Sequence, residues 1–217
     1  MMVSKVDSLY KLLNRMEDKE YIENFISYNV ALISAKLKPS ITLNLFKNNN
    51  KKTYFLWNTY GEEYLKKLGL NYIELRENDK ALIVFIYSEE LLKKVISNYK
   101  SLNFLGSIGY ENCFNIKEVL QKLKERYSIY NCPHELGIFL GYPLEDVKDF
   151  MECTEKKCLA CGYWKVYNEC NKAKTVFALF DKVKEHTAEN ILIGNRHINL
   201  SNILKDKFEK NQKIVFG

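Results

Sequence analysis

Residues 131–151, NCPHELGIFLGYPLEDVKDFM, combine side chains that three different chemistries use. Cys132 and His134 lie two residues apart, which favours a metal site. His134 stands beside Glu135, a pair typical of acid–base work. A glycine, Gly141, separates two short helical patterns, which is typical of a DNA-reading corner. Each of these chemistries requires a different arrangement of the neighbouring residues.

A metal site is supported by the cysteines that follow this stretch. They read Cys153-x4-Cys158-x2-Cys161-x8-Cys170. Two thiolates on a tight turn suit zinc, and the first three cysteines show the C-x4-C-x2-C spacing of plant-type iron–sulfur sites. If a metal binds, we expect Cys158 and Cys161 to be ligands, joined by two of Cys153, Cys170, Cys132 and His134. The alternative is that these are partly buried thiols around a loop.

An acid–base or anion-binding role would centre on His134. The stretch lacks the second histidine of a zinc protease helix, and adjacent helical residues do not face each other, so Glu135 is not its partner. At a helix start, an imidazole beside free backbone N–H groups suits an anionic ligand. We expect Lys38, Tyr163 and Lys165 to accompany it, although a structural histidine bonded to nearby backbone is the simpler alternative.

The DNA-reading interpretation is disfavoured by charge. The second helix of the corner should expose several carboxylates, which phosphates would repel. They belong to Glu145, Asp146, Asp149 and Glu152. We therefore expect a tight helical corner and no sequence-specific DNA binding.

The pattern of apolar residues predicts an α+β fold with one domain. NYIELRE and ALIVFIY predict a β-hairpin over 71–87, and the second strand, apolar on both faces, should be central. GYWKVY (162–167) reads as a further strand of the same small, mostly antiparallel sheet, and 40–46 is another candidate. Several helices should cover the sheet. The expected domain covers 1–187, with 188–217 as a C-terminal helical extension.

Composition restricts the class of protein. The 217 residues are 47% hydrophobic and 28% charged, and no apolar run reaches the roughly 18–20 residues that span a bilayer. We expect a cytoplasmic protein, without membrane association, whose six cysteines are reduced thiols. The net charge of +6 comes from dispersed lysines, which indicates a solvated surface rather than a nucleic-acid interface.

Four segments together resemble one protein family. They are KLKPS at 36–40, the hairpin ending in VFIY, PHELGIFLGYPLEDVKDF at 133–150 and CGYWKVY at 161–167. The resemblance covers about 25–182 and is to domain of unknown function 3793, a family of clostridial and other anaerobic bacterial proteins. It implies a shared fold and a cytosolic protein, and no particular activity. Relatives tend to have arginine where this chain has Ser88.

The function that we expect is binding of a small ligand or cofactor, anionic in character. Its pocket would form where the PHELG helix start, the GYWKVY segment and the KLKPS turn meet, with His134, Lys38, Tyr163 and Lys165 as ligand-binding residues. The first alternative is a redox accessory protein that holds zinc or an iron–sulfur cluster through its cysteines. The second is a structural module that binds a partner protein.

Overall fold

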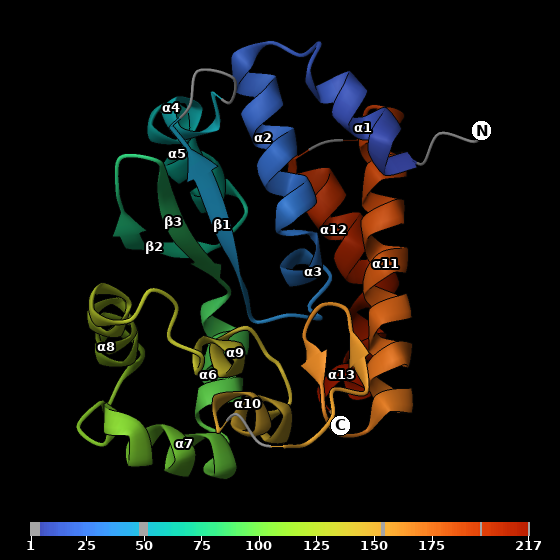
Figure 1. Cartoon of the computed structure of the whole chain (residues 1–217). Helices are drawn as coiled ribbons and strands as arrows, with labels where there is room; N and C mark the ends of the chain where they lie inside the picture. The colour runs from blue at the N-terminus through green and yellow to red at the C-terminus, as the bar shows by residue number, and fades with distance from the viewer. Residues whose placement is uncertain (1–4, 48–51, 153–154, 196, 217) are drawn as a thin grey trace.

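A computed structural model describes residues 5–47, 52–152, 155–195 and 197–216 and confirms the α+β class. A small sheet lies among helices, and the long helix α11 runs along one side of the molecule (Figure 1). The strands are β1 (Ser40–Phe46), β2 (Asn71–Glu77), β3 (Ala81–Tyr87), β4 (Ala160–Cys161) and β5 (Lys165–Val166). The helices are α1 (Lys5–Leu13), α2 (Asp18–Asn29), α3 (Ala31–Ser34), α4 (Thr53–Leu56), α5 (Glu62–Lys67), α6 (Glu89–Ile96), α7 (Tyr99–Leu105), α8 (Ile116–Ile129), α9 (Leu136–Phe139), α10 (Leu144–Met151), α11 (Cys170–Leu192), α12 (His197–Phe208) and α13 (Gln212–Phe216), with helical turns η1 (Trp57–Gly61), η2 (Gly106–Tyr110) and η3 (Glu209–Asn211).

The main sheet is antiparallel, with strand order β1-β3-β2. The prediction that 81–87 forms its central strand is confirmed, as is the candidate strand over 40–46. Both faces of β3 are covered, because Val84 packs toward α2, α4 and α5 while Phe85 packs toward α8, α9 and α10. A strand buried on both faces needs apolar residues at every position, which is the pattern of ALIVFIY.

The prediction that 162–167 belongs to this sheet is wrong. Only Lys165 and Val166 are in a strand, β5, and it pairs with β4 in a separate hairpin beside α11 (Figure 1). The N–H of Gly162 donates to the carbonyl of Trp164 over 3.1 Å, which closes a tight turn between the two strands. A Cβ at Gly162 would lie 2.4 Å from the ring of Phe177, so this turn rests directly on α11.

A second apolar cluster joins the two ends of the described chain. Leu9 of α1 and Leu32 of α3 are buried together with Phe180 of α11 and with Leu200 and Leu204 of α12. Helix α11 continues without a break past residue 187, and α12 packs into this cluster. The division into a domain and an extension at this point stays a prediction.

Two helix starts follow the capping chemistry expected from their residues. The Ser88 hydroxyl accepts from the N–H of Leu91 at the start of α6, and the Asn115 side chain accepts from the N–H of Glu118 at the start of α8. Such caps satisfy backbone donors that have no partner in the first turn. Among the described residues, no helix has both the length and the apolar character that crossing a bilayer requires.

Candidate functional site

The corner between α9 and α10 packs directly against the turn that precedes β1. Gly141 has φ +77°, a conformation that favours glycine, and a Cβ there would lie 2.6 Å from the Cδ of Pro39. The Ser40 hydroxyl donates to the carbonyl of Phe139 over 2.6 Å. Lys38 lies over the ring of Tyr142, 4.8 Å from its centroid. The KLKPS turn and the PHELGIFLGYP corner are therefore in contact, as the sequence predicts.

A pocket of about 230 Å³ opens between this corner and the β4–β5 hairpin. Its lining includes the apolar side chains of Leu136 in α9 and of Val147 and Phe150 in α10. The residues at its edges that bear on chemistry are Cys132, His134, Tyr142, Phe150, Trp164 and Lys165. The pocket thus unites the PHELG helix start with the GYWKVY segment, and it is smaller than the roughly 300–1,000 Å³ of most ligand pockets.

His134 and Lys165 share one aromatic surface in this pocket. The imidazole of His134 lies 4.7 Å from the ring centroid of Phe150, and the ammonium of Lys165 lies 5.1 Å from the same centroid. Across the residues that the structure describes, neither side chain has a hydrogen bond or an ion pair. Their polar atoms are consequently available to a ligand.

The backbone N–H groups of the three residues that open α9 are not free, which contradicts this part of the prediction of free N–H groups beside His134. The N–H groups of Leu136, Gly137 and Ile138 donate to the carbonyls of Pro133, His134 and Glu135, at 3.1, 3.1 and 2.9 Å respectively. Helix α9 is also only four residues long. These three backbone donors are therefore not available to an anion at this site, which makes the side chains of His134 and Lys165 the main candidates to hold it.

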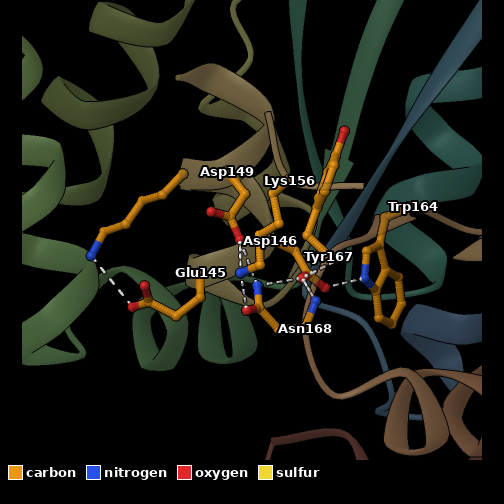
Figure 2. Close-up of polar contacts among 8 residues, drawn as sticks. Glu145, Asp146, Asp149, Lys156, Trp164, Tyr167 and Asn168 are labelled. Carbon is orange, nitrogen blue, oxygen red and sulfur yellow. Dashed lines mark hydrogen bonds and ion pairs between the residues drawn. The ribbon is translucent and has the colours of Figure 1, made fainter. Parts of the chain in front are cut away.

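A buried carboxylate fixes the position of the hairpin strand that carries Lys165. Asp146 is only 3% exposed, so the prediction that it lies on the exposed face of its helix is wrong. Its Oδ2 accepts from the indole Nε1–H of Trp164 over 2.8 Å, and its Oδ1 accepts from the N–H groups of Tyr167 and Asn168 and from the Asn168 side chain (Figure 2). These four bonds hold residues 164–168 against α10.

A second carboxylate of α10 extends this network toward solvent. Asp149 accepts from the Lys156 ammonium over 2.7 Å and from the Asn168 side chain over 2.8 Å (Figure 2). The bond from Lys156, followed by that from Asn168, lowers the pKa of the Asp149 carboxyl. Asp149 therefore reinforces the attachment that Asp146 makes.

Glu135 does not work with its neighbour His134. Its carboxylate is 1% exposed, forms an ion pair with the guanidinium of Arg126 and accepts from the hydroxyl of Tyr110 over 3.3 Å. The Arg126 guanidinium also donates to the carbonyl of Ile108 over 3.2 Å. Both charges of this partly buried pair are thus hydrogen-bonded, and Glu135 serves to join α8 to the start of α9.

The two other predicted ligand-binding residues lie outside the pocket lining. Tyr163 donates its hydroxyl to Asp181 of α11 over 2.9 Å and packs on the rings of Phe177 and Phe180. Burial, followed by the bond to Asp181, raises the pKa of the Tyr163 hydroxyl. Lys38 lies against Tyr142, whose ring forms part of the pocket wall. The structure therefore brings together His134 and Lys165, and not all four.

The predicted metal ligands lie on and around the β4–β5 hairpin. Cys153 falls outside the described residues. Cys158 and Cys161 are exposed, and the Sγ of Cys158 lies 3.2 Å from the carbonyl oxygen of Ala160. The Sγ of Cys170 lies 4.0 Å from the carbonyl oxygen of Leu159. Within the described ranges, no three His, Cys, Asp or Glu side chains are grouped to hold a metal, and the zinc or iron–sulfur site stays a prediction.

Comparison with known proteins identifies the family of the chain. No curated protein and no solved structure matches the chain. Residues 26–201 match the family described as "Protein of unknown function (DUF3793)", a range that contains β1–β5, the corner and the whole of α11. The resemblance carried by KLKPS, PHELGIFLGYPLEDVKDF and CGYWKVY is confirmed, and the chain belongs to this family.

Proposed function

We propose that the protein binds a small amphipathic anion in the pocket between the α9–α10 corner and the β4–β5 hairpin. The apolar body of the ligand lies against α9 and α10, and its carboxylate or similar group lies between His134 and Lys165. The observation that carries this proposal is that, among the described residues, the ammonium of Lys165 has no partner at an apolar pocket and shares one ring with an imidazole, that of His134, that is also without a hydrogen bond.

The character of the ligand follows from the lining. An apolar cavity of about 230 Å³ accepts a small aromatic or branched group and excludes large cofactors. Lys165 supplies a cation, and an ion pair formed at the edge of an apolar pocket is less screened than one on an open surface. A neutral ligand would leave this cation without a partner, so we expect anions to bind more tightly than their neutral analogues.

The cellular setting of this binding is also a proposal. We place the protein in the cytoplasm of an anaerobic bacterium, as the family resemblance implies. The five described cysteines, Cys113, Cys132, Cys158, Cys161 and Cys170, are all free, which agrees with a reducing compartment. Specific recognition of duplex DNA is not part of the proposal, because α10 exposes Glu145 beside its buried Asp146.

Titration calorimetry with matched probes tests the proposal. Phenylacetate carries an aromatic group and a carboxylate, phenylacetamide is its neutral analogue, and phenethylamine its cationic one. We expect binding in that order, with the amine undetectable. Lys165→Met and His134→Ala should each weaken phenylacetate binding by about tenfold or more, the loss that a charge-assisted contact implies.

An exposed lysine on α11 provides the control. Lys174→Met removes the same charge from a position outside the pocket and should leave phenylacetate binding unchanged. Equal affinity for phenylacetate and phenylacetamide, or wild-type binding by both pocket variants, would overturn the proposal.

A further inference from the structure

The pocket that holds His134 and Lys165 also has a thiol at its edge. Cys132 lines this pocket, and the residue is exposed. The pocket encloses only about 230 Å³, so a small ligand that contacts His134 and Lys165 comes within reach of the Cys132 sulfur. This thiol is therefore accessible both from solvent and from the pocket.

A buried hydroxyl is directed at the sulfur of Cys132. The hydroxyl oxygen of Tyr127, a residue of α8 that is 3% exposed, lies 3.9 Å from the Sγ of Cys132. Among the described residues, this hydroxyl has no other hydrogen-bond partner. Burial, followed by the proximity of Cys132, raises the pKa of the Tyr127 hydroxyl, so the hydroxyl stays protonated near neutral pH. It can therefore donate to the sulfur, most strongly when the sulfur carries a negative charge.

A guanidinium with an unused donor lies beside the same loop. Arg76 of β2 donates through Nη1 to the side chain of Asn131 over 3.0 Å, and its charge acts on the Tyr127 hydroxyl against the effect of burial. The Nε–H of Arg76 is buried and has no acceptor in the part of the chain that the structure describes. Because a buried donor without an acceptor is costly, this group favours an anion in its neighbourhood.

These neighbours distinguish Cys132 from the exposed cysteines of the β4–β5 hairpin. The Sγ of Cys158 lies 3.2 Å from the carbonyl oxygen of Ala160, which is an acceptor rather than a donor. Cys158 and Cys161 also lie outside the pocket lining. Reactive cysteines typically lie in partly exposed, electropositive surroundings, and Cys132 has both properties.

The pocket edge favours electrophiles that carry a carboxylate. The imidazole of His134 and the ammonium of Lys165 pack on one ring, that of Phe150, and neither has a hydrogen bond or an ion pair within the described ranges. A small carboxylate held by these two groups has its neighbouring carbon inside the pocket that Cys132 lines. Holding a reactant beside a nucleophile in this way raises the rate of their reaction.

We propose that Cys132 is a covalent modification site of this pocket, alkylated by small carboxylates that carry an electrophilic carbon next to the carboxylate. The sulfur attacks this carbon and forms a thioether. The leaving group departs with the electron pair of the broken bond, and the thiol proton passes to solvent, so the step needs no oxidant or reductant. The proposal rests on the proposed function, since His134 and Lys165 hold the carboxylate.

Alkylation of the native protein by two matched reagents tests this. Iodoacetate and iodoacetamide form the same sulfur–carbon bond with loss of iodide, and only iodoacetate is charged. An ordinary thiolate reacts more slowly with iodoacetate, because the two anions repel each other. Peptide mass spectrometry over time gives the rate at each cysteine. We expect Cys132 to react about tenfold faster with iodoacetate than with iodoacetamide, whereas Cys161 keeps the ordinary order.

Two further measurements relate this preference to the pocket. Lys165→Met should abolish the preference of Cys132 for iodoacetate and leave its rate with iodoacetamide nearly unchanged, because the uncharged reagent does not use the ammonium. Lys174→Met, outside the pocket, should change neither rate. Saturating phenylacetate should slow the reaction of iodoacetate with Cys132 and leave its reaction with Cys161 unchanged.

The ordinary order of rates at Cys132, or a Cys132 that stays unmodified, overturns the proposal. So does a preference for iodoacetate that persists in Lys165→Met, since the pocket cation would then play no part. If calorimetry shows phenylacetate binding in either of these cases, the proposed function stands and only the modification site fails. Loss of both phenylacetate binding and the preference overturns both proposals.

Discussion

Two parts of the same corner treat their polar side chains in opposite ways. Asp146, on α10, is buried and accepts four hydrogen bonds from residues 164–168. His134 and Lys165 line the pocket beside Asp146. Among the described residues, the imidazole and the ammonium have no hydrogen bond or ion pair, and both pack on the ring of Phe150. In the first arrangement the carboxylate of Asp146 and its donors are hydrogen-bonded to each other, so this arrangement stabilises the fold. The second leaves polar atoms free, as a binding site does before its ligand arrives.

The largest effect on stability should come from removing the carboxylate of Asp146, which accepts four hydrogen bonds. Asp146→Ala leaves the Trp164 indole N–H and the N–H groups of Tyr167 and Asn168 without their acceptor, and each partly buried donor costs about 1–3 kcal/mol. We expect a loss of about 3 kcal/mol or more in the free energy of unfolding, measured by urea denaturation. Glu145→Ala, at the neighbouring exposed position, should change it by less than about 0.5 kcal/mol. Equal effects of the two variants would contradict a special role of Asp146.

Lys38 extends the comparison, because its side chain is buried like that of Asp146 and, among the described residues, its ammonium has no hydrogen bond, like the imidazole of His134. Lys38→Met keeps the chain volume and removes the buried charge, so we expect stabilisation by about 1–3 kcal/mol at pH 7. The folded pKa lies below the unfolded one, so from about pH 8 to about 10 the unfolded wild-type chain binds more protons and wild-type stability rises. The advantage of Lys38→Met should therefore shrink over that interval.

Urea denaturation of both proteins across this pH range gives the measurement. Only the difference between variant and wild type is interpreted, since tyrosines with raised pKa also titrate at high pH. A constant difference from pH 7 to pH 10 would show that Lys38 has the same protonation in both states. A destabilised Lys38→Met would show that its ammonium supports the fold.

Gly137 sharpens the comparison, because it lines the pocket and also packs inside the corner. A Cβ at this position would lie 2.8 Å from Cγ2 of Val147. Gly137→Ala should therefore destabilise the protein by about 1–2 kcal/mol, less than Asp146→Ala, because Val147 can shift in part. The same methyl group reduces the pocket, so calorimetry should show weaker phenylacetate binding. Unchanged binding would place the ligand elsewhere.

The smallest effect on stability should come from His134→Ala. The imidazole is exposed, packs on the Phe150 ring and has no hydrogen bond or ion pair within the described part of the chain, so we expect a change below about 1 kcal/mol in the free energy of unfolding. Phenylacetate binding should nevertheless fall. A loss of several kcal/mol would identify His134 as a structural residue and remove it from the site.

Much of the main sheet could be predicted because the residues that determine its strands lie in short continuous segments. ALIVFIY is apolar at every position, and Ser88 caps the helix that follows it, so strand and helix are both visible in short segments. GYWKVY shows how a similar pattern misleads. Its alternation suggests a sheet strand, yet the segment turns at Gly162 and is held by Asp146, a residue from another helix.

The site was predictable in part for the same reason. His134 and Lys165 lie on motifs whose composition suggested a pocket, and the structure brings both to one cavity. The burial of Asp146 and Glu135 could not be predicted, because acidic residues near a helix start are ordinary on a protein surface. Their partners, Trp164 and Arg126, become visible only when distant segments pack together.

The cluster that joins α1 and α3 to α11 and α12 bears on how the protein is made. A ribosome releases residues 9–37 long before residues 176–208, and these two parts bury each other's apolar side chains. During synthesis Leu9, Leu13 and Leu32 therefore stay exposed to solvent until α11 and α12 have been made. The main sheet and the α9–α10 corner can form before that. Nascent chains arrested before α11 should bind hydrophobic-surface dyes and chaperones, and release them once α12 has emerged.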